Sequence, residues 1–165
     1  MDNIELNKTL RHMARNHGLC DAWYGEWRND TTNDELLNMY VRGIDFSINN
    51  DWITNDFAKE HFTEEELAEH GIFFDKQELK EYNLPNLILN GSCSGIAEYN
   101  HFSVGNVYVR HKSKVKITVW DFAKCFIEVY DNAEVEVINY ANNRVFVYQH
   151  GGNVKTKGDV LVRKK

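Results

Sequence analysis

Three short segments near residue 130 decide the fold of this chain when they are aligned: Lys114-Val115-Lys116-Ile117, Glu134-Val135-Glu136-Val137 and Asn153-Val154-Lys155-Thr156. They recur at intervals of 20 and 19 residues. Because successive side chains of a strand point to opposite faces, this register stacks the three leading valines inside and Lys116, Glu136 and Lys155 outside. Opposite charges then face each other on neighbouring strands, and a one-residue slip would turn every valine outward. The pattern predicts a β-solenoid, that is, a single-stranded β-helix.

The same period extends over the rest of the C-terminal half. Ile96 is expected to extend the inner valine row, while Val109, Val129 and, less regularly, Val147 mark a second row. Small or turn-forming residues recur at one phase, as a corner requires: Ser92-Cys93-Ser94, Lys112-Ser113, Asp131-Asn132-Ala133 and Gly151-Gly152-Asn153. We expect three to four coils of 19–20 residues over residues 86–165, triangular or flattened in section. An antiparallel meander is the alternative.

Residues 1–85 are expected to form a small acidic helical domain that caps the solenoid. Leu6, Leu10 and Ala14 keep helical spacing up to Gly18, and Thr32 with Glu35 forms a capping box ahead of a second apolar stripe. Further starts are expected at Thr54 or Asn55 and at the Thr63–Glu66 capping box. Pro85 disfavours helix at the residue before it, so the boundary is expected near residues 82–90. The fold class is therefore α+β.

Charge is divided unevenly between the two halves. Residues 1–90 hold 18 acidic and 8 basic side chains, a net charge of −10, and residues 91–165 hold 7 acidic and 11 basic, a net charge of +4. The acidic half either keeps the chain solvated or occupies a basic groove on a partner. The basic C-terminal residues either protect a strand edge or form a docking surface.

Composition narrows the functional classes. No apolar run approaches the roughly 18 residues of a membrane span, and the first residues lack the features of a signal peptide, so a cytoplasmic location is expected. Cys20, Cys93 and Cys125 are widely spaced and are expected to be buried free thiols. No zinc-type spacing or phosphate-binding loop is present, so no metal or cofactor is expected.

Three weaker signals remain open. The lysines around residue 114, with aromatic residues nearby, suggest an RNA surface, although the stacked glutamates favour a structural ladder. His111 and His150 lie at similar coil phase, and Asp131 is the carboxylate nearest in phase for acid–base chemistry, although surface histidines are the simpler interpretation. Trp23 and Trp27 belong to an unusually aromatic helical half and would mark a binding hot spot if they were exposed.

Two stretches resemble a known group of proteins. Tyr130-Asp131-Asn132-Ala133-Glu134-Val135-Glu136-Val137 and the ending Gly158-Asp159-Val160-Leu161-Val162 resemble uncharacterised repeat proteins of phages and prophages of Bacteroides-like bacteria, which carry iterated Tyr-(Asp/Gly)-Asn-Ala-x-Val units. The resemblance covers roughly residues 87–162. It implies a solenoid half and an origin in a mobile element, and it implies no functional residue.

The leading functional hypothesis is a non-enzymatic protein that inhibits a host defence nuclease, as anti-CRISPR proteins do. Its acidic helices would compete for a basic groove on a nuclease or nucleoprotein. The candidate contacts are Glu64, Glu65, Glu66, Glu69, Trp23 and Trp27. A phage assembly protein that forms homo-oligomers through the solenoid end is the first alternative. A β-helix enzyme or an RNA-binding module is the second.

Overall fold

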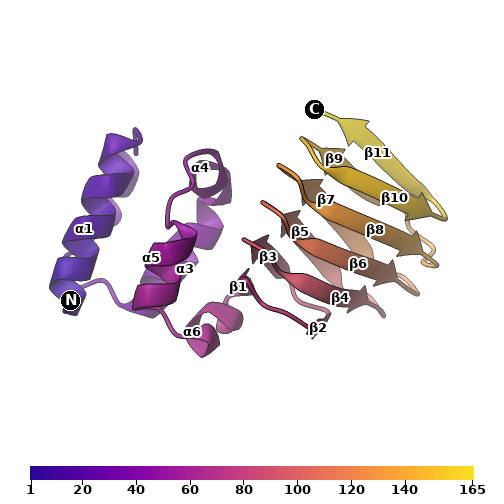
Figure 1. The fold of residues 1–165 in the computed structure, drawn as a ribbon, viewed down its shortest axis with the longest axis horizontal. Helices are drawn as coiled ribbons and strands as arrows, with labels where there is room; N and C mark the ends of the chain where they lie inside the picture. The colour runs from indigo at the N-terminus through magenta and orange to yellow at the C-terminus, as the bar shows by residue number, and fades with distance from the viewer. The chain divides into compact units, whose positions relative to one another are not determined.

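The computed structural model describes all 165 residues and contains two compact units, Met1–His70 and Gly71–Lys165. The first unit is helical and the second is a parallel β-solenoid, drawn from indigo to yellow along the chain in Figure 1. The predicted α+β class is thus confirmed. No helix has the length and apolar character that crossing a membrane requires.

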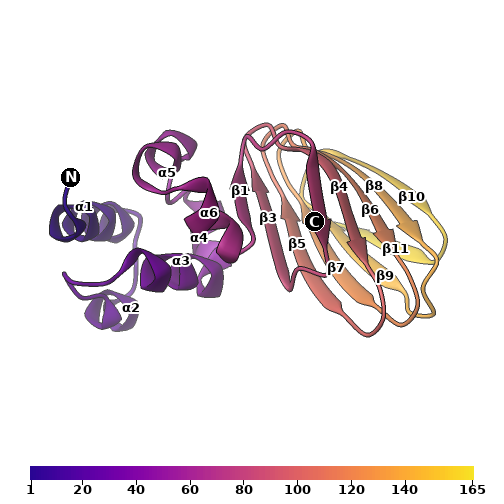
Figure 2. The same ribbon diagram turned by 90° about the horizontal axis from the view of Figure 1, so that it is seen from below.

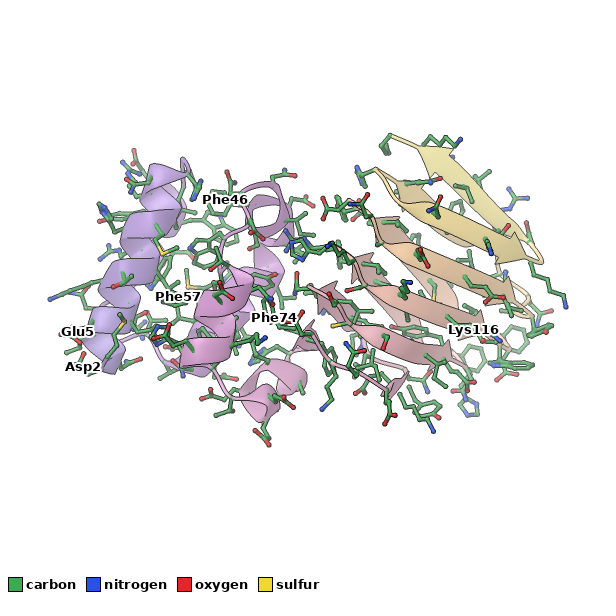
Figure 3. All side chains as sticks on the ribbon, viewed as in Figure 1. Asp2, Glu5, Phe46, Phe57, Phe74 and Lys116 are labelled. Carbon is green, nitrogen blue, oxygen red and sulfur yellow. The ribbon has the colours of Figure 1, made fainter.

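The helical unit contains six short helices, most of which begin at a side-chain cap. They are α1 (Asn3–Asn16), α2 (Asp21–Glu26), α3 (Asn33–Arg42), α4 (Ile44–Asn49), α5 (Asn55–His61) and α6 (Glu64–Glu69). Asp2 with Glu5, both labelled in Figure 3, forms a capping box at α1. The predicted boxes Thr32–Glu35 and Thr63–Glu66 are confirmed, as is the Thr54 cap of α5. These caps satisfy N–H groups that lack helical partners.

Tryptophan rings form the centre of the helical core. Trp27 and Trp52 pack edge to face with their ring centroids 5.4 Å apart, and Tyr40 stacks on Trp52 at 6.2 Å. The indole Nε1 of Trp27 donates a 2.8 Å hydrogen bond to the buried Asn7 side chain. Asn7 in turn donates to the Thr31 carbonyl, so this buried polar group is fully used.

The solenoid contains eleven strands in two parallel sheets. They are β1 (Ile72–Phe74), β2 (Leu79–Tyr82), β3 (Asn86–Asn90), β4 (Ser94–Tyr99), β5 (Val104–Val109), β6 (Lys114–Val119), β7 (Lys124–Val129), β8 (Glu134–Asn139), β9 (Val145–Gln149), β10 (Asn153–Lys157) and β11 (Val160–Lys164). The odd-numbered strands form one sheet and the even-numbered strands the other, as Figure 2 shows. Each coil therefore contributes one strand to each sheet, and the solenoid is flattened. Parallel pairing throughout excludes the antiparallel meander.

The predicted register holds in the central coils and fails at two positions. Val115, Val135 and Val154 align, and Lys116, Glu136 and Lys155 align one residue further on. Gly95 rather than Ile96 aligns with Val115, so Ile96 stands in the outer row with Lys116. Val147 aligns with Ile127 and not with Val129. Both coils repeat after 20 residues, whereas the predicted rows joined Ile96 to Val115 after 19 residues and Val129 to Val147 after 18. An error of one residue exchanges the inner and outer rows.

The solenoid begins earlier than the boundary expected near residues 82–90. Gly71 opens the second unit, and β1 and β2 precede Pro85, so the proposed division at 85/86 is wrong by about one coil. Pro85 instead lies in the connection from β2 to β3, where its carbonyl accepts the Asn106 N–H from the next coil. A proline there interrupts the strand as expected but does not mark the change of architecture. From Asn86 onward β3 to β10 make four coils, in agreement with the predicted number.

The corners repeat one backbone geometry. His101, His111, Asp121 and Asp131 all adopt left-handed φ angles between 53° and 58°. At two of these corners the side chain of one coil accepts an N–H of the preceding coil: Asp121 accepts from His101 at 3.0 Å, and Asp131 accepts from His111 at 2.9 Å. The corners are therefore hydrogen-bonded ladders that run along the solenoid, parallel to the strand ladders.

Candidate functional site

Exposed apolar side chains gather at one edge of the solenoid. Phe102, Trp120, Phe122 and Tyr140 occupy the connections that lead from β4, β6 and β8 to β5, β7 and β9. We call these four residues the aromatic corner. Phe102 is 79% exposed, and the other three are between 40% and 53% exposed. Exposed apolar patches on soluble proteins commonly mark interaction surfaces.

The local sequence holds the aromatic corner rigidly. Trp120-Asp121-Phe122-Ala123 makes a tight turn in which the Ala123 N–H bonds to the Trp120 carbonyl at 3.1 Å, and Ala123 is buried. Asp121 takes the left-handed conformation at the tip. The side chain of Asn142 donates to the Asp121 carbonyl, and that of Asn143 donates to the Phe122 carbonyl. Because Asp121 also accepts the His101 N–H, three successive coils are tied together at this edge.

The rings of the aromatic corner form two stacks that run along the solenoid. Phe102 and Phe122 are nearly parallel, with 7° between their planes and 5.2 Å between centroids, and Trp120 lies 4.6 Å from Tyr140 at 26°. In each pair one face of each ring is covered by its neighbour, and the remaining ring surface is apolar. The aromatic corner is therefore a preformed apolar surface.

Charges near the aromatic corner are few and partly paired. Lys124 follows Phe122 by two residues and aligns with Val104, which is itself exposed. Arg144 follows the last ring and forms a 2.9 Å ion pair with Asp159. The carboxylate of Asp121 is engaged with the His101 N–H. An apolar contact bordered by a modest number of charges is the usual composition of a protein interface.

The acidic residues proposed as partner contacts lie together on α6 but do not play the same role. Glu64, Glu65 and Glu69 are exposed. Glu66 is half-buried, since its carboxylate accepts the Thr63 N–H at 2.9 Å and the Asn33 side chain at 3.2 Å. Glu66 therefore stabilises the start of the helix and is the least available of the four.

The two tryptophans proposed as anchors differ sharply in exposure. Trp27 is 1% exposed and belongs to the core, so it is wrong as a surface anchor. Its burial follows from the hydrogen bond to Asn7 and the contact with Trp52, neither of which shows in the local sequence. Trp23 is half-buried, and the Arg42 guanidinium lies 5.2 Å from its ring centroid.

The outer face of the even-numbered sheet carries the expected charge ladder. Lys116, labelled in Figure 3, pairs in register with Glu136, and Lys155 follows on the next strand. Lys114 and Glu134 form a 3.6 Å ion pair between exposed side chains. Alternating signs neutralise the lysines along this face. It therefore lacks the continuous positive surface on which an RNA-binding interpretation depends.

The histidines named as candidates for acid–base chemistry have structural partners, and two of the three thiols are buried. Asp131 accepts the backbone N–H of His111, and the His111 ring accepts the Gly91 N–H at 2.8 Å. His150 lies 3.1 Å from Glu128 and stacks on Tyr130, so Asp131 is not its carboxylate partner. Burial raises the pKa of Cys93, and that of Cys125 to about 12. Both thiols thus stay protonated at neutral pH.

Cys20 departs from expectation because it is exposed, whereas Cys93 and Cys125 are buried as expected. Trp120 and Phe122 are among the aromatic residues expected beside the lysines around residue 114, but their clustering with Phe102 and Tyr140 was not predicted. The sequence nevertheless contains a signal for this cluster. The segments Trp120-Asp121-Phe122-Ala123 and Tyr130-Asp131-Asn132-Ala133 lie ten residues, or half a coil, apart, and share an aromatic residue, an aspartate and an alanine at equivalent positions. Comparison with known proteins adds no assignment: no family model, no curated protein and no solved structure matches the chain.

Proposed function

We propose that this protein acts by binding another protein through the aromatic corner of its solenoid. The observation that carries the proposal is the exposure of four rings, Phe102, Trp120, Phe122 and Tyr140, at one hydrogen-bonded edge. Removing such rings from water supplies the main favourable term in association, and their rigid backbone limits the entropy lost on binding. Aromatic side chains are also the commonest hot spots of protein interfaces.

The second candidate is the inhibition of a host defence nuclease by the acidic helical unit. Residues 1–70 contain 15 acidic and 6 basic side chains, a net charge of −9, and Glu64, Glu65 and Glu69 are exposed on α6. Such a surface is suited to a basic groove and would be steered to it electrostatically. Trp23 remains a candidate contact, but it lies near Arg42 at the end of α3, whereas Glu66 of α6 bonds to Asn33 at the start of α3. An origin in a mobile element would place the partner in a bacterial host.

One capture experiment tests both candidates. Tagged protein is incubated with lysate of the host at low and high salt, in three forms: the natural chain, a corner variant (Phe102→Ser, Phe122→Ser, Tyr140→Ser) and a helix variant (Glu64→Lys, Glu65→Lys, Glu69→Lys). All substituted residues are exposed, so both variants are expected to fold. Light scattering on each preparation gives its oligomeric state.

The two candidates predict opposite patterns. A partner bound through the aromatic corner is retained at high salt, is lost from the corner variant and persists on the helix variant. A partner bound through the acidic helices is lost at high salt and from the helix variant alone. A discrete oligomer that dissociates only in the corner variant would identify the partner as a second copy bound through the corner. The assembly alternative, which pairs solenoid ends, instead predicts an oligomer that both variants retain.

A further inference from the structure

The helical unit contains an apolar pocket separate from both surfaces described above. It has a volume of about 220 Å³ and lies where the end of α1, α2 and the junction of α3 with α4 meet. Its walls include the rings of Trp23, Trp27, Phe46 and Trp52 and the side chain of Met39. Cys20, whose thiol is free and exposed, also lines it. The pocket is therefore reachable from solvent.

The walls of the pocket are held by contacts that do not depend on a ligand. Trp52 is fixed edge to face against Trp27 at 5.4 Å and against Phe46 at 6.2 Å. Gly43 ends α3, and a methyl group at this position would lie 3.0 Å from the Trp23 ring. The absence of a side chain at Gly43 therefore lets the Trp23 ring approach the helix junction closely. Such pre-formed sites bind without a large ordering cost.

The polar groups around the pocket are already satisfied by the protein. The indole N–H of Trp27 donates to Asn7, and that of Trp52 donates to the Leu10 carbonyl. The Ser47 hydroxyl is within hydrogen-bond distance of the Tyr40 and Gly43 carbonyls. A polar ligand would lose its hydrogen bonds to water and gain none in return. The occupant must therefore be neutral and apolar.

We propose that this pocket binds a small neutral aromatic molecule of one or two fused rings. Size supports this class, since an apolar protein cavity of about 150 Å³ can hold benzene and this one is somewhat larger. Chemistry supports it too, because flat rings pack edge to face against indole and phenyl walls, and the Met39 thioether adds a favourable sulfur–aromatic contact.

Cys20 provides a direct test with the full-length chain and naphthalene, which has two fused rings and no polar group, as the probe. Because Cys93 and Cys125 are buried, alkylation by iodoacetamide in the folded protein reports on Cys20. We expect saturating naphthalene to slow this alkylation at least fivefold. Met39→Phe, which fills the pocket, should abolish the protection. Met13→Phe, the same exchange at a methionine that does not line the pocket, should preserve it.

Two results would overturn the proposal. One is an alkylation rate in the natural chain that naphthalene leaves unchanged up to its solubility limit, a measurement that needs no variant to fold. The other is equal protection in the Met39→Phe variant. Either failure leaves the aromatic corner untouched as a proposal, since the corner belongs to the other unit and its loss would not change Cys20 alkylation.

Discussion

The helical unit and the solenoid solve the same packing problem in opposite ways. In the helical unit each buried residue has its own partners, as when Trp27 bonds to Asn7 and packs on Trp52. In the solenoid the partner of a residue is the equivalent residue one coil away, as when Val115 aligns with Val135. Stability is therefore concentrated in a few residues in the first unit and distributed over repeated rows in the second.

The largest effect is expected where stability is concentrated. Trp27→Ala should destabilise the helical unit by about 3–5 kcal/mol, because it opens a cavity and leaves the buried Asn7 without its donor. Urea unfolding monitored by circular dichroism would measure the loss. Trp23→Ala, at a half-buried ring, is the matched control and should cost clearly less. Equal losses would contradict the view that Trp27 is the centre of this core.

A smaller loss of stability is expected in the solenoid, at a coil whose inner residue is larger than the equivalent residue of the next coil. Gly105 lies under Tyr99, and a methyl group at this position would fall 2.3 Å from the Tyr99 ring. Gly105→Ala should therefore cost about 1–3 kcal/mol through overpacking. Tyr99 aligns with Val119 in the next coil, so Tyr99→Val in the same chain should recover part of that loss.

A double-mutant cycle measured by thermal unfolding tests this pairing. If the two substitutions added independently, the clash between Gly105 and Tyr99 would not be the source of the cost. Tyr99→Val alone is expected to destabilise, since it removes the 2.9 Å hydrogen bond from the tyrosine hydroxyl to the Leu84 carbonyl and leaves space in the core. The two single variants therefore lose stability for opposite reasons.

The same contrast explains what the sequence could reveal. The solenoid register was predictable over residues 114–156 because apolar and charged rows repeat together. It failed at Ile96 because the inner position there is Gly95, which has no side chain to signal it. The capping boxes were predictable because they are local. The burial of Trp27 was not, since a contact with Asn7 twenty residues away leaves no local pattern.

The aromatic corner lay between these cases. Its rings recur with the period of the coil, as Trp120 and Tyr140 show, yet the corners predicted near residues 112 and 131 belong to the opposite set of connections. Exposure of the rings depends on which side of each turn faces solvent, and a turn has no two-residue alternation to reveal it. The acidic residues of α6 could be identified from the sequence. The Glu66 carboxylate, however, caps that helix, so Glu66 contributes to stability rather than to a contact with a partner.

The charge ladder tests how far stability is distributed in the solenoid. Glu136→Lys places three lysines in one row, with Lys116 and Lys155 on either side. We expect a loss of about 1 kcal/mol that shrinks in high salt, because the pairs are exposed and screened. Reversing the flanking residues as well, Lys116→Glu and Lys155→Glu, should restore the alternation and the stability measured by thermal unfolding. A triple variant as unstable as the single one would contradict the ladder.

The smallest effect is expected at Glu81, which lies in the inner row of β2 beside the buried Ala97. Burial raises the pKa of this carboxyl, and Lys76 opposes the rise only in part. The folded state therefore holds the proton more tightly than the unfolded state, so this contribution to stability is complete below the unfolded pKa and is lost as the pH rises through the folded pKa. Glu81→Gln should consequently gain stability over the natural chain as the pH is raised from 4 to 7, when followed by thermal unfolding.

Glu65→Gln, at an exposed carboxyl in the first turn of α6, should show no such gain, because a charge there is favoured by the helix dipole. An equal gain in both variants would mean that net charge, and not the inward position of Glu81, sets the pH dependence. This result bears on the contrast between the end of the solenoid and its inner coils, because β2 is the terminal strand of its sheet. An inward carboxyl on a terminal strand discourages a further strand from pairing. The accompanying small loss of stability is one that the regular inner coils do not have.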